Sequence, residues 1–174
     1  MRTWNRRSKL PASAASTLEL EPGERSLAWA RGRDEQWYVG TDRALHFVGA
    51  GVSRRIGWEH VERAEWDGDQ AVLAVVELFG WGEPERVTKV ELTEAGLLLQ
   101  LIRERVTKSV VCTVYAGVSG RRGLTVVGRR SPAGDGPVSW SYVLAEGLDP
   151  GDDLVQRVAD RTLREAQAEL SWLL

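Results

Sequence analysis

A group of arginines in the second half of the chain is the part of this sequence that comes nearest to a binding site. From Leu97 to Ser131 there are seven basic residues and one acidic residue, a local net charge of +6. Arginine binds phosphate and carboxylate groups through paired, charge-assisted hydrogen bonds. The sequence therefore predicts an anion-binding surface for phosphate, nucleic acid or an acidic protein. Its candidate residues are Arg103, Arg105, Arg121, Arg122, Arg129 and Arg130.

The alternative is that these arginines form a solvated face, paired with acidic residues of the same chain. From Ile56 to Gly96 there are ten acidic and three basic residues, a local net charge of −7. The two stretches have opposite charge, although the whole chain carries only −2. This contrast favours self-association or an acidic protein partner. The near-neutral total gives no argument for a nucleic-acid or membrane partner.

Catalytic and metal-binding patterns are nearly missing from the sequence. It has no phosphate loop ending in Gly-Lys-Ser/Thr, no dinucleotide fingerprint and no Gly-x-Ser-x-Gly elbow. The two histidines, His46 and His60, lack cysteines or carboxylates at metal-ligand spacing. One enzymatic hypothesis remains, a hydrolase that uses Cys112 and His60, and it requires both residues to share one cleft. We expect instead a non-enzymatic protein with no metal and no cofactor, in which both histidines have structural or surface roles.

The chain length fits one domain, or a small domain with an elaboration. A single cysteine excludes an internal disulfide and fits a reducing compartment. No stretch approaches the roughly 18 consecutive apolar residues of a membrane-spanning helix. The basic start of the chain is followed by Pro11–Thr17, which is too short and too polar for a signal-peptide core. We therefore expect a cytoplasmic protein with a disordered tail over residues 1–17.

Alternating apolar residues and turn residues predict seven short strands in the first half of the chain. Their spacing of about 8–12 residues is typical of an antiparallel barrel or sandwich. The run Ala71–Phe79 is apolar on both faces, so we expect it to be the most central strand. The other predicted strands are Ser26–Arg31, Trp37–Thr41, Ala44–Val48, Ser53–Gly57, Arg63–Trp66 and Arg86–Leu92.

After Leu92 the apolar residues recur at the spacing of a helix, for which Thr93 is the predicted N-cap. Two interpretations stay open for Val110–Tyr115, the last turn of this helix or a new strand. Further along, Gly123–Arg130 and Pro137–Ala145 predict a hairpin, and a final amphipathic helix follows Asp149-Pro150.

The tryptophans divide into predicted core and predicted surface residues. Trp29, Trp58, Trp66 and Trp140 lie in or at the ends of predicted strands, where large aromatics fill cores. Trp81 lies between two glycines of a predicted turn, and we expect it to be the exposed one. The alternative is an aromatic platform on which single-stranded nucleic acid stacks.

Three motifs, taken in order, resemble the bacterial and GRAM-type branch of the pleckstrin-homology-like proteins. Glu21-Pro-Gly-Glu-Arg-Ser-Leu-Ala-Trp29 resembles the opening segment of that family. Val39-Gly-Thr-Asp-Arg-Ala-Leu-His-Phe47 resembles its threonine-aspartate-arginine turn, and Ile56-Gly-Trp-Glu-His-Val-Glu-Arg-Ala64 resembles its next aromatic and acidic stretch. The resemblance covers about Leu20 to Lys108. The whole chain also resembles a protein family common in actinobacteria.

This resemblance implies an α+β fold in two parts. Residues 18–110 would form a seven-stranded antiparallel pleckstrin-homology-like barrel, capped by an amphipathic helix. Residues beyond about Cys112 depart from a minimal barrel of this type, and we expect residues 111–174 to form a β-hairpin and a C-terminal helix packed on the barrel as an extension.

The same resemblance gives expectations about partners. Lipid-binding members of the family use a basic loop between the first two strands. Here that loop, Gly32–Gln36, has one arginine and two acids, so the lipid-binding residues do not carry over. We expect a soluble interaction or scaffold module that binds a protein partner or itself. The alternative is anion or nucleic-acid binding through the arginine-rich helix and hairpin.

Overall fold

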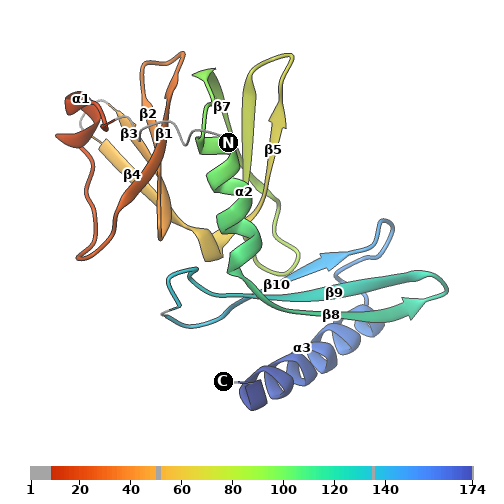
Figure 1. Ribbon diagram of the computed structural model, residues 1–174. Coiled ribbons are helices and arrows are strands. Elements are labelled where there is room, and N and C mark those ends of the chain that lie inside the picture. Colours follow the sequence, from red (N-terminus) through yellow and green to blue (C-terminus); the bar gives the residue numbers. More distant parts are fainter. Residues whose placement is uncertain (1–8, 50–51, 135, 174) are drawn as a thin grey trace, which may run out of the picture.

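The computed structural model describes residues 9–49, 52–134 and 136–173 (Figure 1). Within them the chain is an α+β protein with a seven-stranded antiparallel sheet, a three-stranded antiparallel sheet and three α-helices. The α+β class is therefore as predicted. None of the helices in the described residues is both long and apolar enough to cross a bilayer.

The seven-stranded sheet has the strand order β4-β3-β2-β1-β7-β6-β5, which places β1 at its centre. The prediction that Ala71–Phe79 forms the most central strand is wrong, because its strand, β6, lies next to an edge. Both faces of β6 are nevertheless buried: Val75 packs in the main core, while Val76 is buried on the other side. The strands are β1 (Ser26–Gly32), β2 (Trp37–Thr41), β3 (Ala44–Gly49), β4 (Val52–Gly57), β5 (Val61–Asp67), β6 (Val72–Glu77) and β7 (Arg86–Glu94).

Side chains, rather than backbone pairing, connect the edge strand β4 to the other half of this curled sheet. No strand pairing joins β4 to β5 among the described residues, so a closed barrel is not formed there. Arg54 on β4 instead donates hydrogen bonds to the Glu77 carboxylate on β6 and to Thr88 Oγ1 on β7, the latter at 3.2 Å. Its guanidinium also lies 5.3 Å from the centroid of the Phe47 ring. The two halves of the sheet thus enclose one core.

The helix α2 (Leu98–Ser109) packs on this core, against β1, β2, β5 and the short 3-10 turn η1 (Trp58–His60) (Figure 1). Gly40 permits the close approach, because a Cβ there would lie 2.6 Å from Leu101 Cδ2. Trp58 is fully buried, as predicted, and its indole N–H donates to the Thr41 carbonyl at 3.0 Å.

The predicted N-cap of this helix is wrong, because Thr93 belongs to β7. Its hydroxyl donates to the Arg31 carbonyl at 2.9 Å and so serves the neighbouring strand. The helix begins at Leu98, after a turn in which Gly96 has a φ of +49°. Glycine tolerates that left-handed conformation with little strain.

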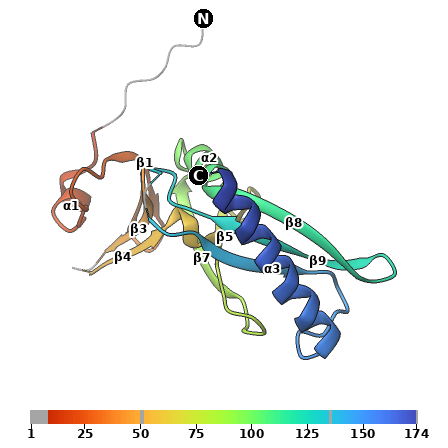
Figure 2. The same cartoon turned by 90° about the horizontal axis from the view of Figure 1, so that it is seen from below.

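The second half of the chain folds as a three-stranded sheet with a helix on one face. Val110–Tyr115 is strand, and β8 (Val110–Ser119) follows α2 without an intervening loop. The strands β9 (Arg122–Arg129) and β10 (Ser139–Leu144) form the predicted antiparallel pair, and the sheet order is β10-β9-β8. The final helix α3 (Asp153–Leu173) lies along β8 and β9, as Figure 2 shows. Leu124 and Val126 of β9 pack against Val155 and Val158 of α3 to form a second core.

The chain start and two tryptophans differ from expectation. Residues 1–8 of the predicted tail lie outside the described residues, and further on α1 (Ala12–Ala15) makes one helical turn with Ala14 buried. Trp66, predicted as core, is 38% exposed because it lies near the end of β5, beside the turn. Trp81, predicted as exposed, is half-buried and packs against Tyr142 of β10.

Candidate functional site

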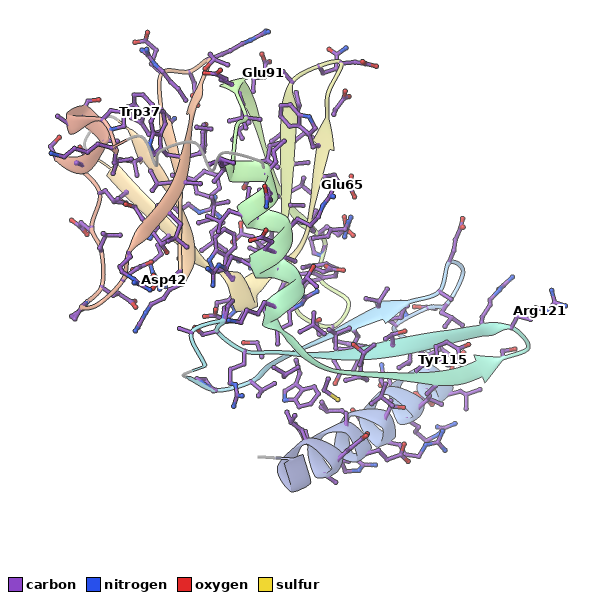
Figure 3. The ribbon with its side chains drawn as sticks, in the orientation of Figure 1. Trp37, Asp42, Glu65, Glu91, Tyr115 and Arg121 are labelled. Atoms are coloured by element: carbon purple, nitrogen blue, oxygen red, sulfur yellow. The ribbon has the colours of Figure 1, made fainter. Side chains whose placement is uncertain are left out.

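The structure does not gather the six predicted arginines onto one surface. Arg121 and Arg122 lie at the turn between β8 and β9, far from the first sheet (Figure 3). Arg129 is at the opposite end of β9, roughly 23 Å from Arg122 at about 3.3 Å per residue. Arg130 follows Arg129, and Arg103 and Arg105 are on α2. The hairpin tip and the end near α2 are therefore separate basic regions.

Arg129 is a structural residue, since only 7% of it is exposed. Its guanidinium donates to the Glu62 carbonyl at 2.8 Å, to Ser109 Oγ at 3.1 Å and to the Val106 carbonyl at 3.3 Å. Burial lowers the pKa of Arg129, and the charge of Glu62 only partly opposes this. These bonds connect β9 to α2 and β5, so Arg129 joins the two sheets and is not available to a ligand.

The acidic stretch of the first sheet is paired with arginines of that same sheet. The pairs include Arg63–Glu85 at 2.9 Å, Arg33–Glu91 at 3.1 Å and Arg54–Glu77. The six predicted arginines, by contrast, make no ion pair with any described residue. These six arginines therefore do not form ion pairs with the acidic stretch of the same chain. The exposed members of the basic group keep their charge available.

The most accessible part of the second sheet is the outer half of its face opposite α3. One cross-strand row there places Tyr115 of β8 beside Thr125 of β9, and Thr125 beside Val143 of β10. Tyr115 is 62% exposed and Val143 is 46% exposed. We call this row, with Gly123, the distal face. Arg121 marks the tip end of the same hairpin (Figure 3).

The inner half of the same face is covered. In the neighbouring cross-strand row Val127 lies between Ser141 and Thr113. Val127 and Ser141 are buried, whereas Thr113 on the edge strand is exposed, and Arg129 beyond them bonds to α2 and β5. This face of the sheet therefore contacts α2 and β5 near Arg129 and is exposed to solvent near Tyr115 and Val143. Tyr115 was not among the predicted site residues. The apolar residues Cys112, Val114, Ala116 and Val118 alternate with it and pack toward α3, which leaves Tyr115 on the opposite face.

Gly123 creates the space in which the Tyr115 ring lies. A Cβ at Gly123 would come within 2.5 Å of Tyr115 Oη and 2.3 Å of the Ala116 carbonyl oxygen. An aromatic ring that covers a glycine on a neighbouring strand fills the gap that the missing side chain leaves.

We expect Gly123→Ala to displace the Tyr115 ring and to lower the free energy of unfolding by about 2 kcal/mol, the usual scale of overpacking. Gly117→Ala is the matched control, because Gly117 faces Gly123 across the pair and a Cβ there meets nothing within 4 Å. Urea titration followed by circular dichroism measures both. Equal stability of the two variants would contradict this account of the distal face.

The residues of the hydrolase hypothesis lie in different parts of the molecule. Cys112 packs in the second core beside α3, where burial, and then the charge of Glu169, raise the pKa of its thiol. A reactive cysteine needs the opposite shift. His60 is on η1 of the first sheet, with Nε2 3.7 Å from Glu59 Oε1 and over half of its side chain exposed. The shared cleft that the hypothesis requires is not among the described features of the fold.

A buried polar network around His46 is a feature that the sequence analysis did not predict. His46 Nε2 lies 3.0 Å from Glu24 Oε1, and the Thr41 hydroxyl donates to the same oxygen at 2.5 Å. All three side chains are buried. Burial raises the pKa of Glu24, but hydrogen bonds from Thr41, His46 and the Glu21 backbone N–H outweigh it, so the pKa is lowered. The network ties the segment before β1 to β2 and β3.

Comparison with known proteins identifies no relative: no family model, no curated protein and no solved structure matches this chain. The resemblance to pleckstrin-homology-like proteins therefore depends on the residues and strand order of this chain alone. Its function has to be argued from the surface that the fold presents.

Proposed function

We propose that this chain is a protein-interaction module, built on a pleckstrin-homology-like barrel, whose second sheet binds an acidic segment of a partner protein. The strand order β4-β3-β2-β1-β7-β6-β5, followed by a helix packed on the curled sheet, supports the barrel. The Arg54 bridge supports it further, since it connects the edge strand β4 to β6 and β7 in the other half of the sheet.

The observation that carries the proposal is the exposure of the distal face. Tyr115 and Val143 remain open to solvent in the same sheet face whose inner half is buried. Aromatic residues and arginines are enriched where proteins bind one another, and apolar groups beside them exclude water. The distal face combines an aromatic ring and an aliphatic side chain, with Arg121 at the hairpin tip beside it (Figure 3).

Charge indicates which kind of partner this face would bind. Arg121 and Arg122 are exposed and have no carboxylate partner among the described residues. Arg122 lies beside Gly147, on the side of the sheet that faces α3, so it is Arg121 at the tip that favours an acidic segment on the distal face. A second copy of the chain is less suited, because much of the first sheet's acidic charge is already paired with Arg33, Arg54 and Arg63. Nucleic acid is also less suited, since Arg129 is buried and the remaining arginines are divided between two ends.

Binding of short fluorescent peptides, followed by anisotropy, tests the proposal. The probe alternates glutamate with leucine and tyrosine, and a second peptide has lysine in place of each glutamate. We expect the acidic peptide to bind, and Val143→Ser and Tyr115→Ser each to weaken it roughly tenfold or more, as for central interface residues. Val87→Ser is the matched control, because Val87 on β7 is similarly exposed at 44% but lies outside the distal face.

The competing functions give different results. Binding of a single-stranded DNA probe with no binding of the acidic peptide would overturn the proposal in favour of nucleic acid. Sedimentation that depends on protein concentration, abolished by Tyr115→Ser, would replace the acidic partner with a second copy. Equal binding of the acidic and the basic peptides would also contradict it, since the arginines would then contribute nothing.

A further inference from the structure

A second surface feature lies on the other side of β10, between the two sheets. Trp81, from the loop between β6 and β7, meets Tyr142 of β10 and three residues of α3 around a cavity of about 330 Å³. The cavity is lined by Trp81, Tyr142, Gln156, Ala159 and Asp160. Tyr142 belongs to the face of β10 that packs toward α3, whereas Val143 belongs to the distal face. The two surfaces are thus separate.

Two aromatic rings form a corner of this cavity. The ring centroids of Trp81 and Tyr142 are 4.9 Å apart, and the ring planes meet at 84°. In this edge-to-face contact the edge of one ring points at the face of the other, and both residues line the cavity. The face of an aromatic ring attracts cations, most strongly for tryptophan.

The corner is held in place by hydrogen bonds. The indole N–H of Trp81 donates to the Pro150 carbonyl at 2.9 Å, and the Gln156 side-chain amide donates to the same oxygen at 3.1 Å. Ala159 is only 2% exposed and closes the floor. Because these positions are fixed without a ligand, little ordering is required when one binds.

A carboxylate completes the lining. Asp160 is exposed on α3 and makes no ion pair with the described residues. Its charge reaches Tyr142, whose phenol pKa is raised by burial first and by Asp160 second. Asp160 also lines a neighbouring depression of the α3 surface, together with Arg157, Arg161 and Arg164. The lining of the cavity therefore includes one carboxylate and two aromatic rings but no arginine or lysine, and the three arginines lie on the other side of Asp160.

We propose that this cavity binds an alkylated ammonium group, with Trp81 and Tyr142 against its methyl groups and Asp160 against its charge. Aromatic rings beside a carboxylate suit an alkylated ammonium group, because the positive charge of that group is spread over its methyl groups and the methyl groups lose little hydration on binding. The group could come from a free choline-like molecule or from the methylated lysine of a protein. This inference is independent of the acidic partner of the distal face.

Titrations with small probes, followed by isothermal calorimetry and by the amide and indole NMR signals of Trp81, test this site. The probes are choline, N-acetyl-trimethyllysine amide and 3,3-dimethylbutan-1-ol, which is the uncharged analogue of choline. We expect both ammonium probes to bind, and the uncharged analogue to bind at least about tenfold more weakly. Tighter binding of choline indicates a free ligand, and tighter binding of trimethyllysine indicates a protein side chain.

Variants separate the binding role of the cavity from a structural one. Asp160→Asn is expected to weaken the ammonium probes at least about tenfold with an unchanged unfolding midpoint, because Asp160 is exposed. Asp153→Asn removes a carboxylate from the first turn of the same helix, outside the cavity, and should leave binding unchanged. Equal binding of the charged and uncharged probes would overturn the proposal. Full affinity in Asp160→Asn would overturn it as well.

Discussion

Replacing Glu24 with alanine is expected to lower the free energy of unfolding by about 3 kcal/mol. The Glu24 carboxylate accepts hydrogen bonds from Thr41 and from the Glu21 backbone, and it contacts His46, all in a buried site. Its removal leaves these groups buried without that partner, and each such loss costs about 1–3 kcal/mol. Urea titration followed by tryptophan fluorescence measures the change. Glu19→Ala, an exposed glutamate of the same segment, is the control, expected within about 0.5 kcal/mol of the parent.

The same residue predicts a pH dependence whose sign follows from its lowered pKa. A carboxyl that is more acidic in the folded than in the unfolded protein contributes stability above its ordinary pKa, and this contribution disappears as the pH falls through the folded pKa. The parent should therefore lose stability on acidification below the ordinary glutamate range. Glu24→Gln should lose less over the same range. An identical acid limb in both proteins would exclude Glu24 as a contributor.

Replacing Arg129 with alanine is the second change with a large expected effect, again about 3 kcal/mol. Arg129 donates to carbonyls of Val106 and Glu62 and to the Ser109 hydroxyl, and hydrogen bonds to a charged group are worth about 1.5–3 kcal/mol each. Since these bonds join β9 to α2 and β5, the loss should also reduce the cooperativity between the two sheets. We expect hydrogen exchange to rise in β9 and at the end of α2, and the unfolding transition to broaden.

Two further substitutions at this joint distinguish charge from packing. Arg129→Met keeps most of the side-chain volume and removes the guanidinium, so an intermediate loss is expected. Arg130→Ala is the matched control, because its half-buried side chain has no ion-pair partner among the described residues. A stable and fully cooperative Arg129→Ala protein would show that other contacts join the two sheets.

The local spacing of apolar and turn residues was enough to predict most of the strands and helices. It failed where contacts with residues distant in the sequence decide a helix cap or the exposure of a side chain. The alternation of apolar residues gave the strands, including the β9–β10 pair. Thr93 has the right type for a helix cap, but its hydroxyl bonds to Arg31, 62 residues away in sequence. Trp81 looked like an exposed turn residue because its partner carbonyl, on Pro150, lies 69 residues further along.

The candidate sites show the same division. The arginines are concentrated in one stretch of the sequence, but the sequence alone could not tell that one strand would hold Arg122 and Arg129 at opposite ends. His46 was expected to have a structural or surface role, but its partner could not be named, because Glu24 is 22 residues away and no motif joins them. Tyr115 becomes notable only once β8 is known to be an edge strand with one face against α3.

The direct continuation of α2 into β8 fixes how the two sheets can act together. Ser109 ends the helix and Val110 begins the strand, so no flexible segment separates them. This connection keeps the two sheets at a fixed distance. A partner bound to the first sheet and a partner bound to the distal face would therefore be held at a fixed spacing. If two such partners were joined to each other, binding of the first would give the second a high effective concentration at its own site. This holds only if the distance between the partners matches the spacing of the two sheets.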